Sequence, residues 1–261
     1  MSLFRTKEHA QRKYIDLIKE ATSKWPNWNP TREIQVGDFG KVNIKTGDFI
    51  VEGNIYTDVN IAKIASQYPP VQVPEVDYYQ IPSYEARALD VKANGDGADK
   101  GILFKTQWQF NNKRGALFFM YRPRSTRVPK EFFNPSLLPI LRGKFVVYQV
   151  WRSPGFYMYL SNRSSEKVTV GLRTNATAPG GANASPSVTV NWFSEGTAGV
   201  AQHAYRPDAE IRTPLLRRDE SSMGIEGWHE ADVPWDDLDE EGVTEPETIY
   251  DNGSVSSDDD D

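Results

Sequence analysis

The chain has 261 residues, of which 38% are hydrophobic, enough to bury the core of one sizeable domain of mixed class. It contains no cysteine, which excludes a disulfide framework, a thiolate metal site and a cysteine nucleophile. No run approaches the roughly 18 apolar residues of a membrane-spanning helix, and residues 1–10 lack the apolar segment of a secretory signal. We therefore expect a soluble protein of the cytoplasm.

The formal net charge of −6 hides two parts of opposite sign. Residues 219–261 contain 17 Asp or Glu and no Lys or Arg, whereas residues 1–218 hold 30 basic and 19 acidic residues. A basic body favours contact with an anionic surface. Hydrophobic periodicity also stops after Arg218, so we predict a folded domain over 1–218 and an acidic, disordered tail over 219–261.

Residues 3–23 are predicted to form a helix, because Ala10, Tyr14, Leu17, Ile18 and Ala21 recur at helical spacing. Basic residues occupy much of the remaining surface: Arg5, Lys7, Arg12, Lys13 and Lys19. Two interpretations stay open, an amphipathic helix packed on the domain and a basic helix that meets anionic lipid. Each Lys or Arg near such a surface contributes about 1 kcal/mol.

The next part of the chain is predicted to be rich in strands. A β-hairpin is expected over 36–56, followed by a short helix after Asp58 and an extended stretch over 71–83. The next hairpin has strands over 84–93 and 102–110, with Ile102, Phe104, Trp108 and Phe110 alternating with Lys105, Gln107 and Gln109. The segment Ala116–Tyr121 is fully apolar and should be a core strand.

Four basic residues follow, Arg122, Arg124, Arg127 and Lys130. No nucleic-acid motif accompanies them, so a solvated or headgroup-facing loop is the preferred interpretation and nucleic acid is not an expected partner. A short helix from Pro135, a hairpin made of 145–151 and 156–160, and final strands over 200–205 and 211–216 complete the predicted domain.

The segment 166–194 is predicted to be a second amphipathic hairpin. Val168, Val170 and Leu172 alternate with polar residues on the first strand, as do Val188, Val190 and Trp192 on the second. Its tip, Thr174–Pro186, carries no charge. An ordinary surface hairpin has these features. A hairpin that crosses a lipid surface also has them, because an uncharged tip is inexpensive to move through hydrocarbon.

No enzymatic motif is present. The three histidines are scattered, and the chain lacks a nucleophile elbow, a phosphate-binding loop and a zinc-protease helix. We predict that the protein is not an enzyme and needs no cofactor or metal. Dispersed carboxylates leave open an enzyme whose site is formed by distant residues.

The order of these elements over about residues 1–218 resembles the pore-forming domain of the gasdermins, and most closely the short fungal gasdermin-like proteins that regulate cell death in allorecognition. The resemblance rests on the basic N-terminal helix, the VGDFG…TGDFIVEGNIY hairpin, the two amphipathic hairpins, and LLPILRGKFVVYQVWRSPGFYMYL between them. It implies an α+β domain with a twisted, mainly antiparallel sheet, amphipathic hairpins and peripheral helices.

The resemblance also implies a mechanism. Acidic lipids bind the domain, both hairpins straighten, and many copies close a β-barrel pore in the plasma membrane. The lipid-facing residues would be Ile102, Phe104, Trp108, Val168, Val170, Leu172, Val188, Val190 and Trp192. The lumen-facing residues would be Lys105, Lys167, Arg173 and Asn191. The headgroup-binding residues would be Arg5, Lys7, Arg12, Lys13 and Lys19.

One departure concerns control of the pore. Animal gasdermins carry a large C-terminal repressor domain, whereas the 43 residues after Arg218 are too few and too polar for one. The fungal relatives imply assembly as a homo-oligomer or with a divergent allelic variant, and we hypothesise that the acidic tail covers the basic body. The alternative function is a soluble β-rich module that binds anionic lipid or a protein partner without inserting.

Overall fold

A computed structural model describes residues 3–30, 32–93, 101–111, 113–133, 141, 143–177, 187–196, 198–205 and 211–219. Within them the fold is α+β and mainly antiparallel, as predicted. The helical elements are α1 (Leu3–Thr22), α2 (Ala62–Ala65) and the 3-10 helix η1 (Lys130–Phe132). The first strands are β1 (Trp25–Pro26), β2 (Asp38–Val42), β3 (Phe49–Asn54), β4 (Val71–Val73), β5 (Tyr78–Pro82), β6 (Ala86–Ala93), β7 (Ile102–Phe110) and β8 (Ala116–Tyr121). The later strands are β9 (Arg124–Arg127), β10 (Phe145–Ser153), β11 (Gly155–Leu160), β12 (Lys167–Thr177), β13 (Ser187–Glu195), β14 (Val200–Tyr205) and β15 (Ile211–Asp219).

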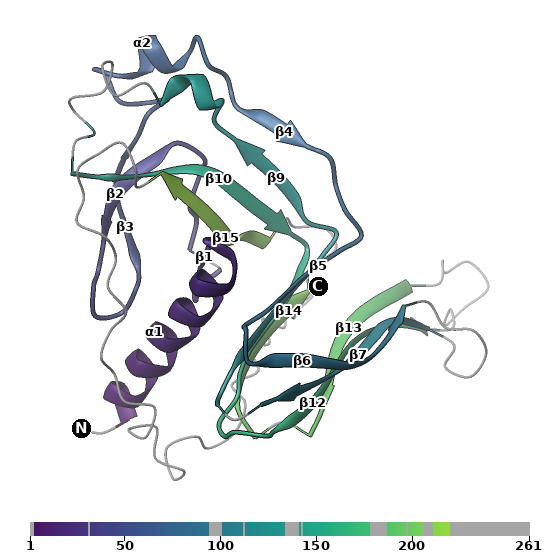
Figure 1. Ribbon diagram of the computed structural model, residues 1–261. Coiled ribbons are helices and arrows are strands. Elements are labelled where there is room, and N and C mark those ends of the chain that lie inside the picture. The colour runs from purple at the N-terminus through teal and green to yellow at the C-terminus, as the bar shows by residue number, and fades with distance from the viewer. Residues whose placement is uncertain are drawn as a thin grey trace, which may run out of the picture.

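The strands divide among three sheets (Figure 1). The large sheet has the order β1-β15-β10-β2-β3, with β9 on β10 and β4 on β9. The central sheet has the order β14-β11-β8-β5, and the hairpin sheet has the order β13-β12-β7-β6. The two predicted amphipathic hairpins, β6–β7 and β12–β13, thus lie side by side in one sheet.

The central sheet is covered on both faces, which explains why all six residues of β8 are apolar. Alternation sends Ala116, Phe118 and Met120 into a core shared with Tyr14 and Ile18 of α1. On the opposite face Leu117 and Phe119 pack against the hairpin sheet. The middle layer is therefore a sheet with α1 on one side and the hairpin sheet on the other (Figure 1).

α1 is also held from a second side by the turn between β2 and β3. The amide Nε2 of Gln11 donates to Thr46 O at 2.9 Å and to Asp48 Oδ1 at 2.8 Å. The side chain of Ile15 packs directly over Gly47, where a Cβ would come within 2.6 Å of Ile15 Cδ1. α1 therefore packs against two neighbours, the central sheet and the β2–β3 turn.

Two local predictions were wrong. Residues 145–151 and 156–160 do form strands, but β10 belongs to the large sheet and β11 to the central sheet, so they are not a hairpin. The chain turns from one sheet to the other at Ser153, whose hydroxyl bonds to Gly155 and to Tyr121 O at 2.7 Å. The basic segment 124–127 is strand β9 and not a loop, because it pairs with both β4 and β10.

Other predictions lie outside the described residues. These are the helix from Pro135, the turn between the predicted strands 84–93 and 102–110, residues 178–186 of the predicted tip Thr174–Pro186, and the tail beyond Asp219. Residues 174–177 of that tip were predicted wrongly, because they belong to β12 and pair with 187–190 of β13. Of the helices within the described ranges, none has both the length and the apolar character of a membrane-spanning helix.

Candidate functional site

The hairpin sheet is the candidate functional site, and its strands are continuous in register. β12 pairs with β7 from Lys167–Gln109 to Arg173–Ile102, and with β13 from Thr169–Glu195 to Thr177–Ser187. Among the described residues β6 pairs only with β7, and β13 only with β12. The four strands therefore form a sheet whose two edge strands each have a single partner.

One face of the hairpin sheet is apolar and buried against the central sheet. Its fully or nearly buried members are Trp108, Phe110, Val168, Val170, Leu172, Val190 and Trp192. Aromatic rings fill the interface, since Trp192 lies 5.7 Å from Tyr157, 5.6 Å from Phe104 and 6.4 Å from Phe119, measured between ring centroids. Such contacts contribute about 0.5–1.5 kcal/mol each beyond the area that they bury.

Most residues predicted to face lipid lie on this inner face, although the structure does not test their contact with lipid. Phe104 is half-buried there, and Val188 lies in β13 opposite Ala176, with its side chain outside the described set. Ile102 differs, because a register shift after Leu172 pairs it with Arg173. Leu103 packs against the interface in its place. Strict alternation could not anticipate this bulge.

The outer face is polar, as alternation predicted. Lys167, Arg173 and Asn191 are exposed, and Lys105 is half-exposed. Phe193, which the sequence analysis did not single out, lies over Gly171. Its ring centroid is 5.9 Å from Lys105 Nζ and 5.8 Å from the guanidinium carbon of Arg173. By strand alternation Phe193 shares the face of Asn191 and not that of Trp192, and this pattern could have predicted an aromatic ring on the polar face.

A buried carboxylate ties the base of both hairpins to the central sheet. Glu166, just before β12, is 4% exposed. Its side chain accepts the N–H groups of Asn162 at 3.1 Å and Ala198 at 2.8 Å, and the hydroxyl of Tyr159. Its backbone carbonyl accepts the N–H of Phe110 at the end of β7. Burial raises the pKa of Tyr159, so its hydroxyl keeps the proton that it donates.

The predicted headgroup-binding residues of α1 differ in burial and in their contacts. Arg5 and Lys7 lie in α1, with side chains outside the described set. Arg12 and Lys13 are buried, which corrects their expected place on the helix surface. Arg12 Nε pairs with Asp16 Oδ1 at 3.0 Å, and its Nη1 donates to Ile44 O at the tip of the β2–β3 turn. Lys19 Nζ lies 5.3 Å from the centre of a Trp25 ring.

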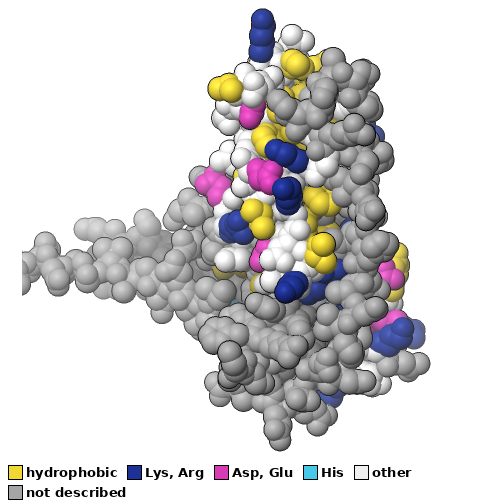
Figure 2. All heavy atoms as spheres, turned by 90° about the vertical axis from the view of Figure 1, so that its left-hand side faces the viewer, with side chains coloured by type: hydrophobic (Ala, Val, Ile, Leu, Met, Phe, Trp, Pro, Cys, Tyr) yellow, Lys and Arg dark blue, Asp and Glu magenta, His cyan; other side chains and the backbone are white. Residues whose placement is uncertain are grey.

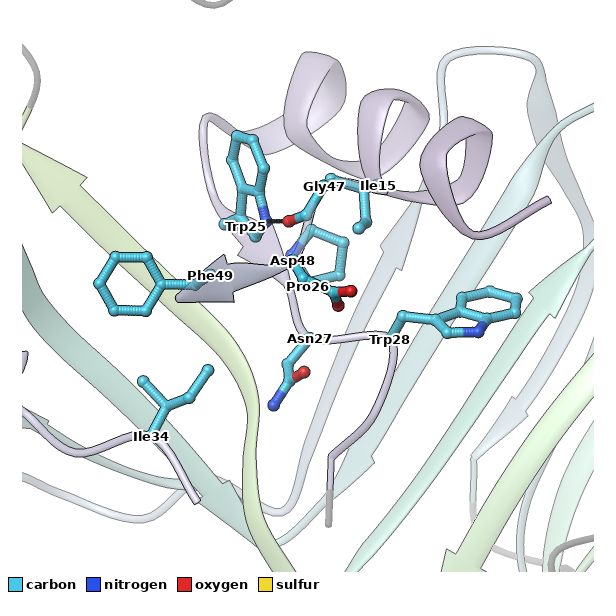
Figure 3. Close-up of a pocket in the computed structure, with 9 residues that line it drawn as sticks. All are labelled: Ile15, Trp25, Pro26, Asn27, Trp28, Ile34, Gly47, Asp48 and Phe49. Atoms are coloured by element: carbon cyan, nitrogen blue, oxygen red, sulfur yellow. Dashed lines mark hydrogen bonds between the residues drawn. The ribbon is translucent and has the colours of Figure 1, made fainter. Parts of the chain in front are cut away.

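A small space separates α1 from the segment 25–28 and the β2–β3 turn (Figure 3). It is bordered by Ile15, Trp25, Pro26, Asn27, Trp28, Ile34, Gly47, Asp48 and Phe49. Its volume is about 10 Å³, room for a single water molecule. The indole N–H of Trp25 donates across its edge to Gly47 O at 2.9 Å. This space therefore has no room for a substrate.

The described residues contain no group of three or more His, Cys, Asp or Glu side chains placed to hold a metal ion. Comparison with protein-family models and with curated proteins gives no match for this chain.

The Glu166 contacts predict a large effect on stability. Replacing Glu166 by Ala leaves the buried Tyr159 hydroxyl and two partly buried backbone N–H groups without their acceptor, at a cost of about 2 kcal/mol. Urea unfolding followed by tryptophan fluorescence measures this loss. Glu195→Ala is the control, because that carboxylate is 64% exposed and its removal should change stability by less than about 0.5 kcal/mol. Equal stability of the two variants would contradict the proposed role of Glu166.

The partly buried ring of His203 leads us to predict that the protein loses stability in mild acid. Its ring stacks on Tyr157 of the buried interface at 5.7 Å, and burial lowers the pKa of His203 below its ordinary value of 6.5. The unfolded chain then binds more protons than the folded one, so stability is complete above about pH 6.5 and falls as the pH drops towards the folded pKa. We expect the free energy of unfolding to decrease from pH 7 to pH 5 less steeply in His203→Gln. The same pH slope in both proteins would refute this assignment.

Proposed function

We propose that this chain is a pore-forming protein of the gasdermin type. It rests in the cytoplasm, binds acidic lipids, assembles in the plasma membrane and triggers cell death, as in fungal allorecognition. The observation that carries the proposal is the hairpin sheet, in which two amphipathic hairpins share one apolar face and one polar face. Assembly joins copies of this chain, alone or with a divergent allelic variant.

The lengths of the strands support insertion. A membrane-spanning strand needs about 9–11 residues. β7 has 9 residues, β12 has 11, β13 has 9 and β6 has 8. A module that binds lipid or protein without inserting does not require two hairpins of this length, so strand length favours the pore over that alternative.

The apolar face supports the same conclusion through its energetics. Burying a large apolar side chain stabilises by about 1.5–3 kcal/mol, and hydrocarbon removes it from water as protein does. Residues such as Val170 and Leu172, which are fully buried against the central sheet, can thus exchange that partner for lipid tails at little hydrophobic cost. The exchange separates the hairpin sheet from Phe119 and Tyr157.

The first contact with lipid is proposed on the side of the molecule that carries α1 and the β2–β3 hairpin. Figure 2 shows hydrophobic, basic and acidic side chains interspersed on the described part of this side. Ile44 at the turn is 73% exposed, and Ile50 and Val51 of β3 are also exposed. The nearby Lys41 pairs with Glu52 Oε1 at 3.4 Å. Exposed Lys45 follows Ile44 directly, so apolar and cationic groups are available together. Arg5, Lys7, Arg12, Lys13 and Lys19 join them after α1 is released.

The experiment uses the absence of native cysteine to place a single probe. Val190→Cys and Asn191→Cys are adjacent on β13, one 9% exposed on the inner face and the other on the outer face. Each is labelled with an environment-sensitive fluorophore and added to acidic or neutral vesicles that contain nitroxide-bearing lipid tails and a trapped dye. We expect dye release from acidic vesicles only, with quenching at position 190 and not at position 191.

Each outcome of that experiment discriminates between the functions. Binding to acidic vesicles with no release and no quenching, with or without a divergent allelic relative, would favour the non-inserting module. Equal quenching at 190 and 191 would contradict the assignment of the two faces. Thermal unfolding of the labelled proteins before addition of vesicles controls for misfolding.

The acidic tail is proposed to oppose lipid binding by covering the basic body. A chain that ends at Asp219 retains β15 and removes 16 of the tail's 17 acidic residues. At low salt it should bind acidic vesicles more tightly than the full chain, and the difference should shrink near 1 M salt, where the Debye length is about 3 Å. Equal binding by both chains at low salt, measured by vesicle flotation, would refute this role of the tail.

A further inference from the structure

The outer face of the hairpin sheet carries an unbalanced charge. Residues directly opposite each other in neighbouring strands share a face, so the strand register assigns the ionisable residues whose side chains the structure describes. The basic members with described side chains are Arg87, Lys105, Lys167 and Arg173, and the acidic member is Glu195. The face therefore has a net charge of +3, whereas the inner-face positions of these strands hold no ionisable residue.

The charges at the centre of this face are held in place and remain accessible. Lys105 and Arg173 both lie near the Phe193 ring, at 5.9 and 5.8 Å from its centroid. Glu195 is 4.0 Å from Lys105 Nζ and both side chains are partly exposed, so this pair contributes little and screens Lys105 incompletely. Lys167 and Arg173 are exposed.

We propose that the pore formed by this chain favours anionic solutes, because the positive outer face becomes the wall of the lumen. This inference rests on the proposed function, since the outer face lines the lumen only where the inner face meets lipid. The charge of +3 then repeats with every copy in the ring.

The predicted preference for anions is opposite to the preference that the net charge of the whole chain would give. The complete protein has a net charge of −6, because 17 acidic residues follow Arg218. If total charge, or the tail, controlled passage, the pore would favour cations. The arrangement of the strands predicts the opposite preference, and one measurement separates the two.

The experiment records the full-length protein in planar bilayers of fixed acidic lipid composition. The ratio of chloride to potassium permeability is obtained from the reversal potential across a tenfold KCl gradient. We expect a ratio above one near 0.01 M salt, where the Debye length is about 30 Å, and a ratio that approaches one near 1 M, where it is about 3 Å.

Charge-changing variants test whether the outer face of the hairpin sheet sets the preference for chloride. Lys105→Glu with Arg173→Glu changes the face from +3 to −1 and should turn the preference towards potassium. Lys105→Gln with Arg173→Gln leaves +1 and should give an intermediate ratio, which keeps the test informative if the charge-reversed protein forms no channels. Lys63→Glu with Lys130→Glu is the matched control, because it makes the same change of charge at exposed residues of α2 and η1. Its ratio should equal that of the natural protein.

Failure of this inference is distinct from failure of the proposed function. Channels that favour potassium in the natural protein, or a ratio unchanged in both the Glu and Gln variants, would overturn the lumen assignment and leave pore formation standing. No conductance in acidic bilayers would refute the proposed function itself.

Discussion

The contact between the hairpin sheet and the central sheet is the interaction on which the rest of the structure depends. It fixes the inward direction of Trp108, Val170 and Trp192, and it makes β8 and β11 apolar on both sides. In the proposed function, hydrocarbon offers these side chains nearly the same removal from water, so hydrophobic burial contributes almost equally to both states. The equilibrium between the compact and the inserted state then depends on the polar contacts that only the compact state makes. The Glu166 carboxylate is the best-connected of these, and the bond from Trp192 Nε1 to Ala204 O at 3.1 Å is another.

Backbone hydrogen bonding couples insertion to assembly. β6 and β13 each have one strand partner in the described structure, so each presents an edge of N–H and C=O groups. Water satisfies such groups at a protein surface, but hydrocarbon cannot, and each unsatisfied group costs several kcal/mol there. A single hairpin sheet is therefore unstable in a membrane, whereas a ring in which β6 of one copy meets β13 of the next satisfies every strand. This requirement makes the proposed pore cooperative in protein concentration.

Local pattern predicted the parts of this fold that depend on local geometry. Alternation over 102–110, 166–173 and 187–194 identified the strands and most of their faces, because successive side chains of a strand point to opposite sides. It failed where distant segments decide. The assignment of β10 and β11 to different sheets depends on β15 and β14, whose paired residues lie 40 or more positions later in the chain. Arg12 and Lys13 are buried because α1 is enclosed by other elements, a contact that helical periodicity cannot reveal. The bulge at Leu103 likewise follows from pairing with β12.

In the proposed function, the burial of Arg12 adds a constraint on how lipid binding can begin. Its guanidinium already bonds to both oxygens of Asp16 and to Ile44 O, so it meets a phosphate only after α1 leaves the β2–β3 turn. A phosphate can replace the carboxylate, since both accept the paired N–H groups of arginine. The exchange also requires Gln11 to release Thr46 and Asp48. Apparent affinity for lipid is then reduced by the fraction of molecules in which α1 is free. Exposed residues of the same turn, Ile44 and Lys45, need no such release and can make the first contact with the membrane.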